Sequence, residues 1–261
     1  MKMQGTPKKI VLLVNDSYFS YLLAKDLIDK HHSEIDKIVF SKAIKNSREK
    51  IFDIFKKASL RFFVYRVFVF FLTNFFYRKH TVGYLAKKYK ICVTNIEKLK
   101  DFDFEGKMYD IGFAFNFDII INEGFLRKIK KGVFNIHASK LPLDKGISPV
   151  LWAFARGDKE IWSTIYKIDK GIDTGDIFRQ FRIDVQENDS AFSLYERVCQ
   201  ISGKELEQSF SELINEPTLQ KPKEINFESY FSWPDKNFEK MLIANKRKLF
   251  KFMDLWISKK N

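Results

Sequence analysis

The chain has 261 residues, of which 45% are hydrophobic and 28 are Phe, and it carries a formal net charge of +13. This length fits one large domain or a main domain with a small appendage, and the composition supports a real hydrophobic core. The two cysteines stand far apart and the four histidines lack zinc-ligand spacing, which argues against a disulfide framework and a metal site. The positive charge suits nucleic acid, a membrane surface, a nucleotide diphosphate or a polyglutamylated folate, and does not choose among them.

Apolar runs and helical patterns alternate along most of the chain. Residues 10–14 predict a buried parallel strand, and turn residues then lead into an amphipathic helix over 18–30. Residues 43–90 are mostly helical in pattern. Further buried strands are expected over 35–40, 91–94, 108–115 and 132–136.

The second half continues the pattern and then changes. A helix over 150–155 ends at Gly157, two strands over 162–168 and 176–185 flank a turn, and a helix follows over 191–214. After two Pro-containing stretches come an aromatic segment, 225–233, and a basic helix, 235–257. Strands alternating with helices predict an α/β fold with a doubly wound, mostly parallel sheet. We expect a catalytic domain over 1–215 and a small C-terminal subdomain over 216–261, serving dimerisation or acceptor binding.

One apolar segment, residues 60–77, requires separate treatment. Charged and polar residues interrupt it, and its uncharged part, 67–77, is far shorter than the roughly 20 residues of a spanning helix. We expect a buried or dimer-facing helix. The alternative is a helix at a membrane surface, because Lys56, Lys57, Arg78 and Lys79 flank the segment. Near the N-terminus the apolar run is short and no cleavage site follows it, so no signal peptide is expected.

Two short segments bring an amide, an imidazole and a carboxylate together: residues 134–142, FNIHASKLP, and residues 171–176, GIDTGD. An imidazole titrates near neutral pH, so His137 can accept a proton from an attacking amine. The amide of Asn135 can donate to the oxygen that becomes negative in a tetrahedral intermediate. The carboxylate of Asp173 can orient the imidazole and stabilise its protonated form. We therefore predict Asn135, His137 and Asp173 as a catalytic trio for acyl transfer.

These segments resemble the formyltransferase family, whose members move a formyl group from N10-formyltetrahydrofolate to an amine. The resemblance runs over about residues 8–185 and is sharpest over 132–177. It implies a Rossmann-like catalytic domain in which the same three residues are catalytic. The chain departs from the family at Lys140, where many members carry an apolar residue, and at 144–146, where DKG replaces an aromatic-Arg-Gly.

The resemblance also implies where the ligands bind. It assigns part of the folate site to Ser139, Lys140, Leu141 and Pro142, for which a plain Pro-stiffened turn is the alternative. It assigns the pterin pocket to the apolar loop with Phe115, Asn116, Phe117 and Ile119, for which core packing is the alternative. Candidates for the acceptor's phosphate are Asn15 and Ser17, at the carboxyl end of the first strand.

Three kinds of acceptor are compatible with the resemblance. Methionyl-tRNA formyltransferases carry a sizeable C-terminal barrel for tRNA, and glycinamide ribonucleotide formyltransferases end soon after the catalytic helix. This chain lies between them and is most similar to enzymes that formylate nucleotide-linked amino sugars for surface polysaccharides such as O-antigen. The expected acceptor is therefore the amine of a dTDP- or GDP-linked 4-amino-4,6-dideoxyhexose. A methionyl-tRNA or other small-amine formyltransferase is the alternative.

The expected protein is thus a cytoplasmic, folate-dependent N-formyltransferase that forms a homodimer. It would bind a nucleotide-diphosphate amino sugar and N10-formyltetrahydrofolate, with no metal, no nucleic acid and no membrane span. An alternative of another class is a non-catalytic basic module that binds membrane or nucleic acid through residues 60–77 and its Lys clusters. That alternative predicts binding that persists when His137 is replaced, and no formyl transfer.

Overall fold

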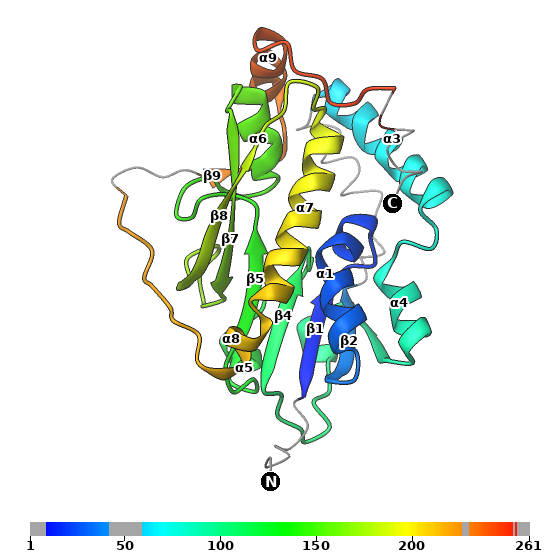
Figure 1. The fold of residues 1–261 in the computed structure, drawn as a ribbon, viewed down its shortest axis with the longest axis vertical. Coiled ribbons are helices and arrows are strands. Elements are labelled where there is room, and N and C mark those ends of the chain that lie inside the picture. Colours follow the sequence, from blue (N-terminus) through cyan, green and yellow to red (C-terminus); the bar gives the residue numbers. More distant parts are fainter. Residues whose placement is uncertain (1–8, 42–58, 226–229, 253, 255–261) are drawn as a thin grey trace.

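The computed structural model describes residues 9–41, 59–225, 230–252 and 254. A seven-stranded sheet in the order β3-β2-β1-β4-β5-β7-β8 forms its centre (Figure 1). The first five strands in this order run parallel, whereas β7 and β8 are antiparallel to their neighbours. The strands are β1 (Ile10–Val14), β2 (Ile35–Ser41), β3 (Cys92–Ile96), β4 (Ile111–Phe115), β5 (Val133–His137), β7 (Glu160–Lys167) and β8 (Ile177–Asp184). The predicted mostly parallel α/β sheet is confirmed.

Helices cover the sheet, and two hydrophobic cores lie on its two faces. Alternate residues of β1 divide between the cores: Ile10, Leu12 and Val14 join the larger one, and Val11 and Leu13 join the smaller one. This alternation is what a strand buried on both faces requires. The helices are α1 (Tyr18–His31), α3 (Leu60–Phe76), α4 (Val82–Tyr89), α5 (Glu123–Leu126), α6 (Pro149–Arg156), α7 (Ala191–Gln208), α8 (Phe210–Asn215) and α9 (Lys236–Ala244). Leu99–Asp101 form a 3-10 turn, and β6 (Lys145–Gly146) pairs with β9 (Tyr230–Phe231).

Two predicted helices differ in length from the observed ones. The helix expected over 191–214 is interrupted at Ser209, whose hydroxyl donates to the carbonyl of Glu205 and accepts from Arg179. Such a bond back to the preceding turn competes with the helical backbone pattern. The helix expected over 235–257 ends at Ala244, because Lys246 takes a left-handed φ of 53° and the chain turns there. Within 43–90, residues 43–58 lie outside the described residues.

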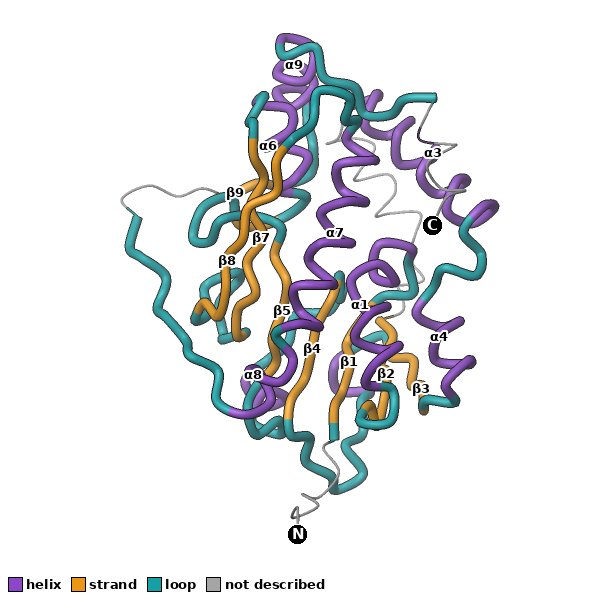
Figure 2. Tube along the Cα trace, in the orientation of Figure 1, coloured by secondary structure: helices purple, strands orange, loops and turns teal. Residues whose placement is uncertain are grey.

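The chain after α8 crosses the edge of the sheet and then packs over α6 and α7. Figure 2 shows a long loop leaving α8, and Gln220 exchanges two backbone hydrogen bonds with Ile177 at the start of β8. Phe238 and Leu242 on α9 belong to the larger core, which also contains residues of α6 and α7. The described part of 216–261 therefore packs directly on the 1–215 region. The division into two units stays a prediction.

The Phe-rich helix α3 is half buried. Phe62, Tyr65, Val69 and Leu72 point into the larger core, as expected for a buried helix, while the opposite side of the helix is exposed. Within the described parts of the chain, every helix is too short or too polar to cross a bilayer.

The sheet reverses its order of connection between β1 and β4, which lie side by side at its middle. In open α/β sheets, ligands bind at such a switch point, outside the carboxyl ends of the strands. The carboxyl ends of β1, β4 and β5 therefore mark where a functional site is expected.

Candidate active site

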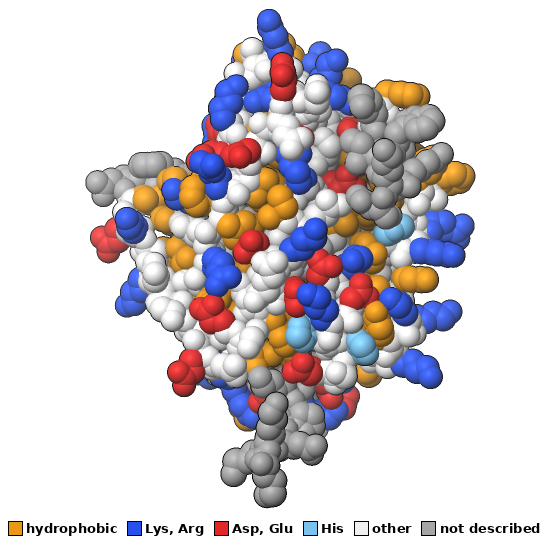
Figure 3. All heavy atoms as spheres, in the orientation of Figure 1, with side chains coloured by type: hydrophobic (Ala, Val, Ile, Leu, Met, Phe, Trp, Pro, Cys, Tyr) orange, Lys and Arg blue, Asp and Glu red, His pale blue; other side chains and the backbone are white. Residues whose placement is uncertain are grey.

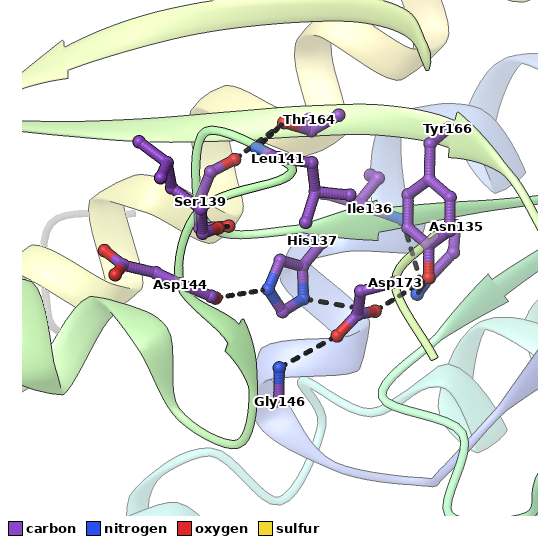
Figure 4. A network of polar contacts seen from close by, with 11 residues as sticks. Asn135, Ile136, His137, Ser139, Leu141, Asp144, Gly146, Thr164, Tyr166 and Asp173 are labelled. Carbon is purple, nitrogen blue, oxygen red and sulfur yellow. Dashed lines mark hydrogen bonds and ion pairs between the residues drawn. The ribbon is translucent and has the colours of Figure 1, made fainter. Parts of the chain in front are cut away.

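Asn135 and His137 occupy alternate positions at the carboxyl end of β5. In the register of the sheet, Asn135 lies opposite Ala114 of β4 and Tyr166 of β7, and His137 lies opposite Thr164. Both side chains point to the same side of the strand, as their spacing predicts, and both line one cleft. Asp173 lies in the turn between β7 and β8, and Figure 4 shows that it comes within reach of both. The structure thus brings the three predicted residues together.

A chain of hydrogen bonds joins Asn135 to Asp173 through a tyrosine. Asn135 Nδ2 donates to the Tyr166 hydroxyl at 3.0 Å, and that hydroxyl donates to Asp173 Oδ1 at 2.9 Å. The backbone N–H of Ile136 donates to Asn135 Oδ1 at 2.8 Å, which fixes the amide with its NH₂ toward Tyr166. Burial and the nearby charge of Asp173 raise the pKa of Tyr166, so its hydroxyl stays protonated and acts as the donor.

The Asp173 carboxylate is held by a second donor. The backbone N–H of Gly146 donates to Asp173 Oδ2 at 2.9 Å, and Asp173 is only 8% exposed. Gly146 has a φ of 94°, and a Cβ there would lie 2.3 Å from the carbonyl oxygen of Phe231. Only glycine places a backbone N–H at this point without a clash. Asp173 itself has a left-handed φ of 53°, a conformation that Asp adopts more readily than most residues.

The glycine after Thr174 fixes the same turn against β7. A Cβ on Gly175 would lie 1.8 Å from the carbonyl oxygen of Lys167, so the turn can pack there only with glycine. Asp169 accepts hydrogen bonds from the backbone of Gly171 and the hydroxyl of Thr174. These contacts give Asp169 a structural role and hold the Asp173 carboxylate beneath the end of β5.

His137 makes contacts through both ring nitrogens. Nε2 lies 2.9 Å from the backbone oxygen of Asp144, and Nδ1 lies 3.6 Å from Asp173 Oδ1 (Figure 4). A carbonyl oxygen can only accept, so Nε2 carries the proton in this contact and Nδ1 is the basic atom of the neutral ring. A proton taken up at Nδ1 would face the Asp173 carboxylate. The Asp144 carbonyl orients the ring, and the carboxylate is placed to stabilise its charged form.

Asp144 is held by a bidentate ion pair. Arg156, on α6, places Nη1 and Nη2 at 3.1 and 2.6 Å from the two carboxylate oxygens of Asp144, and it also bonds Asp158. Paired, partly buried guanidinium and carboxylate groups of this geometry are among the stronger polar contacts. Arg156 therefore fixes the segment whose carbonyl orients His137.

The trio opens into a cleft of about 930 Å³ at the carboxyl ends of β1, β4 and β5. Of the residues assigned to ligands by resemblance, Asn15, Ser17, Asn116, Phe117 and Ile119 line it. Phe115 does not line the cleft. Its side chain is fully buried in the larger core, which agrees with core packing, the alternative to a ligand role for this residue.

The side chains of the 139–142 segment lie outside this cleft and form a turn behind His137. Ser139 Oγ donates to the carbonyl of Leu143 at 2.7 Å, and Leu141 is 2% exposed. Lys140 Nζ lies 3.9 Å from the centre of the Trp162 ring. Pro142 follows a cis peptide bond and faces a separate shallow pocket near Thr174. These contacts match the plain-turn alternative, and a folate role for the four residues stays a prediction.

The two polar candidates after β1 already have partners. Ser17 caps α1 by accepting from the N–H of Ser20 at 3.2 Å, and Asn15 accepts from the Ser20 hydroxyl at 2.6 Å. Asp16 accepts from the N–H of Gly83 at 2.9 Å. The backbone N–H groups at the start of α1, rather than these side chains, are therefore what this edge offers to an anion.

Several residues of the site were not predicted from the sequence. Tyr166 lies in a segment correctly predicted as a strand, but its role depends on the register that sets it opposite Asn135. Thr164 is buried and bonds the backbone of both Ser139 and Leu141. Arg66, on α3, is the one Lys or Arg among the described residues that line the cleft. In the described ranges there is no group of three or more His, Cys, Asp or Glu placed to hold a metal ion.

The middle of the chain matches a known family. Residues 106–209 match the family model described as formyl transferase, a range that contains the whole Asn135, Tyr166, His137 and Asp173 network. The predicted family resemblance is confirmed over these residues.

Among curated relatives, the bifunctional polymyxin resistance protein ArnA of Wigglesworthia glossinidia brevipalpis is 34% identical over 148 residues, 55% of this chain and 23% of that protein. The GDP-perosamine N-formyltransferase of Brucella melitensis is 37% identical over 99 residues, covering 35% of this chain and 38% of that protein. The methionyl-tRNA formyltransferase of Nitrosomonas eutropha is 30% identical over 146 residues, covering 53% and 46%. The chain spans less than half the length of each of these relatives.

A solved structure supports the fold. The chain is similar, with a TM-score of 0.58 and 20% identity, to the sugar 3N-formyl transferase WlaRD, over 87% of this chain and 70% of that one. At this identity the likeness concerns the fold, and it agrees with the predicted Rossmann-like sheet.

Proposed function

Because residues 106–209 match the formyl transferase family model, we propose that this chain transfers the formyl group of N10-formyltetrahydrofolate to the amine of a nucleotide-linked amino deoxysugar. The acceptor class includes dTDP- and GDP-linked 4-amino-4,6-dideoxyhexoses. One observation carries the proposal: Asn135, Tyr166, Asp173 and His137 form a continuous polar network at the end of β5, and it opens into a cleft large enough for two ligands.

The network contains a group for each step of formyl transfer. The acceptor nitrogen attacks the formyl carbon, a C–N bond forms, and the formyl oxygen gains negative charge. Asn135 Nδ2 uses one hydrogen for Tyr166, and its other hydrogen has no partner among the described residues, so it can donate to that oxygen. Because Tyr166 and the Ile136 N–H hold the amide in place, little reorganisation is needed as the charge develops.

His137 and Asp173 provide the groups for proton transfer. The attacking amine loses a proton to Nδ1 of His137, and the resulting imidazolium lies beside the Asp173 carboxylate. A water molecule can carry a proton from this pair to the leaving N10 nitrogen as the C–N10 bond breaks. The charge balance is complete: one proton leaves the amine and one reaches the donor.

The cleft wall after β4 fits a flat heterocycle. Its lining includes Asn116, Phe117 and Ile119, together with the backbone between them, and so combines an apolar surface with main-chain donors and acceptors. We assign the folate donor to this wall because it lies beside Asn135, whose neighbour across the sheet is Ala114 of β4.

The acceptor belongs on the other side of the trio, near α1 and α3. Residues at the start of α1, where a helix can bind an anion through its first backbone N–H groups, line the cleft, and Arg66 of α3 lies on the same cleft. The negatively charged phosphates of a nucleotide diphosphate can bind both to the start of α1 and to Arg66. The 37% identity over 99 residues to a GDP-perosamine N-formyltransferase favours the same class of acceptor. A cytoplasmic homodimer that acts in surface polysaccharide synthesis remains a prediction from the sequence.

A direct assay tests the proposal. Formyl transfer from N10-formyltetrahydrofolate would be followed with a panel of nucleotide-linked 3-amino and 4-amino deoxysugars, with initiator methionyl-tRNA as the competing acceptor. We expect formylation of at least one amino sugar, and a loss of about a hundredfold or more in Asn135→Ala. Formylation of the tRNA and of no amino sugar would show that the acceptor is the tRNA and not a nucleotide-linked sugar. No transfer to any amine would leave the basic binding module as the better description.

A further inference from the structure

The helix α3 exposes a large apolar face that nothing in the described structure covers. The helix carries seven exposed large hydrophobic residues, with Phe75 76% exposed and Phe71 65% exposed. The other five are Leu60, Val64, Val67, Phe70 and Phe76. Clusters of this kind on a surface mark an interaction site, whereas single exposed apolar residues do not. Figure 3 shows hydrophobic side chains at the edge of the molecule where α3 lies, beside Lys and Arg side chains.

The charges within the α3 segment are all of one sign. Residues 60–79 contain four cations and no Asp or Glu. Arg61 bonds Glu239 of α9, but Arg66, Arg78 and Lys79 have no ion pair among the described residues. All three are exposed. The helix that bears the apolar face therefore also carries positive charge that has no ion-pair partner among the described residues.

This pattern distinguishes between two occupants. A second copy of the chain docked through α3 about a two-fold axis would set one 60–79 segment against the other, and neither segment has an acidic residue to pair with the cations. A phospholipid surface with anionic head groups can bind both the apolar side chains and the cations of α3. The phenylalanines would enter the boundary of the acyl chains, and the cations would contact the head groups.

We propose that α3 is a membrane-docking helix that lies flat on an anionic phospholipid bilayer. Its 17 residues give a length of about 25 Å, which suits a helix in the plane of the interface. Leu60, Val64, Phe71 and Phe75 recur at helical spacing and define the docked side. Arg66 and Phe70 both line the catalytic cleft and are exposed, so docking places the cleft beside the lipid surface.

Flotation with vesicles tests this without any measurement of catalysis, so its failure and that of the proposed function are distinct. The full chain would be mixed with vesicles of phosphatidylcholine alone, or of phosphatidylcholine with phosphatidylglycerol. We expect binding to the mixed vesicles, weaker binding to the neutral ones, and release as the salt concentration rises.

Two variants, each with a matched control, locate the contact. Phe71→Ser with Phe75→Ser should weaken binding by about a hundredfold or more, while Ile243→Ser, an exposed apolar residue on α9, should leave it unchanged. Arg78→Gln with Lys79→Gln should weaken binding by about twenty-fivefold. Lys128→Gln with Lys204→Gln, which removes the same charge from exposed sites elsewhere, should have a far smaller effect.

Two results would overturn the proposal. One is equal binding of the Phe71→Ser, Phe75→Ser variant and the unmodified chain to the mixed vesicles. The other is a chain that ignores vesicles but sediments as a dimer, with the same double variant sedimenting as a monomer. That second result would identify the face as a contact between copies.

Discussion

The hydroxyl of Tyr166 donates a hydrogen bond of 2.9 Å to Asp173, across the gap between β7 and the turn that follows it. Because the same hydroxyl accepts from Asn135 Nδ2 at 3.0 Å, it connects the predicted oxyanion donor to the predicted carboxylate. The aspartate therefore acts on both other members of the trio: on His137 by charge, and on Asn135 through the tyrosine.

Replacing Tyr166 by Phe should lower kcat more than it raises KM. The ring and its packing remain, but Asn135 loses the acceptor that orients its amide and Asp173 loses a donor. A hydrogen bond to a charged group contributes about 1.5–3 kcal/mol, which corresponds to about a ten- to hundredfold loss of rate. Steady-state kinetics measures the effect. Tyr109→Phe is the matched control, because the Tyr109 hydroxyl also bonds an aspartate, Asp36 at 3.3 Å, outside the cleft. Similar losses in both variants would contradict a role for Tyr166 in the site.

Asp173→Asn should reduce kcat by about a hundredfold or more, since the side chain keeps its size but loses its charge. The neutral amide can no longer stabilise an imidazolium at the 3.6 Å separation of His137 Nδ1. Asp176→Asn, in the same turn but outside the network, should behave like the unmodified enzyme. An Asp173→Asn enzyme with near-normal kcat would remove the carboxylate from the mechanism.

Two of the three predicted catalytic residues have a local relation, whereas Asp173 was predicted from a separate motif, residues 171–176. Asn135 and His137 stand two positions apart in a strand, so their shared side follows from the period of the strand. The buried strands were predicted from continuous apolar runs such as residues 10–14, and β1 occupies that range. Short spacing and strong periodicity carry this information directly.

The parts of the site that were not predicted from the sequence depend on the register between strands and on contacts made by backbone atoms. Tyr166 meets Asn135 because of the antiparallel pairing of β5 with β7, and no local pattern states which residues lie opposite each other. Asp144 acts on His137 through its carbonyl, an atom that every residue possesses. Ser139 and Leu141 resemble ligand residues in sequence, yet their polar atoms are used within the turn.

Thr164→Val should destabilise the fold and disturb the turn behind His137. Thr164 Oγ1 donates to the Ser139 carbonyl at 2.6 Å and accepts from the N–H of Leu141 at 3.2 Å and from Gln180 at 3.0 Å. Valine has the same shape and cannot replace any of these bonds, so buried backbone groups lose partners at a cost of about 1–3 kcal/mol each. Urea unfolding measures the change. Thr94→Val, in a partly exposed strand position, should change the free energy of unfolding by less than about 0.5 kcal/mol. Equal stability of the two variants would show that the turn is held by other contacts.

A buried carboxyl beneath the cleft should make stability depend on pH. Glu196, on α7, is 5% exposed and accepts a hydrogen bond from the Tyr18 hydroxyl. Burial raises its pKa, the charge of Asp254 raises it further, and the Tyr18 bond acts in the opposite direction. Between the unfolded pKa, about 4.3, and the higher folded pKa, the native state binds more protons than the unfolded chain. Stability is therefore fully present below the unfolded pKa and falls as the pH rises through the folded one.

Glu196→Gln should remove part of this loss. The amide oxygen can still accept from Tyr18, and no charge has to be buried at neutral pH. Thermal unfolding from about pH 4 to about pH 8 should show a Tm that falls less steeply in the variant, with its advantage growing as the pH rises. Some slope should remain, because burial also raises the pKa of Asp254, and Asp254→Asn in addition should flatten it further. Glu187→Gln, at an exposed position, should have the same Tm as the unmodified protein at every pH. Parallel Tm curves for Glu196→Gln and the unmodified protein would mean that Glu196 is already charged in the folded state at low pH.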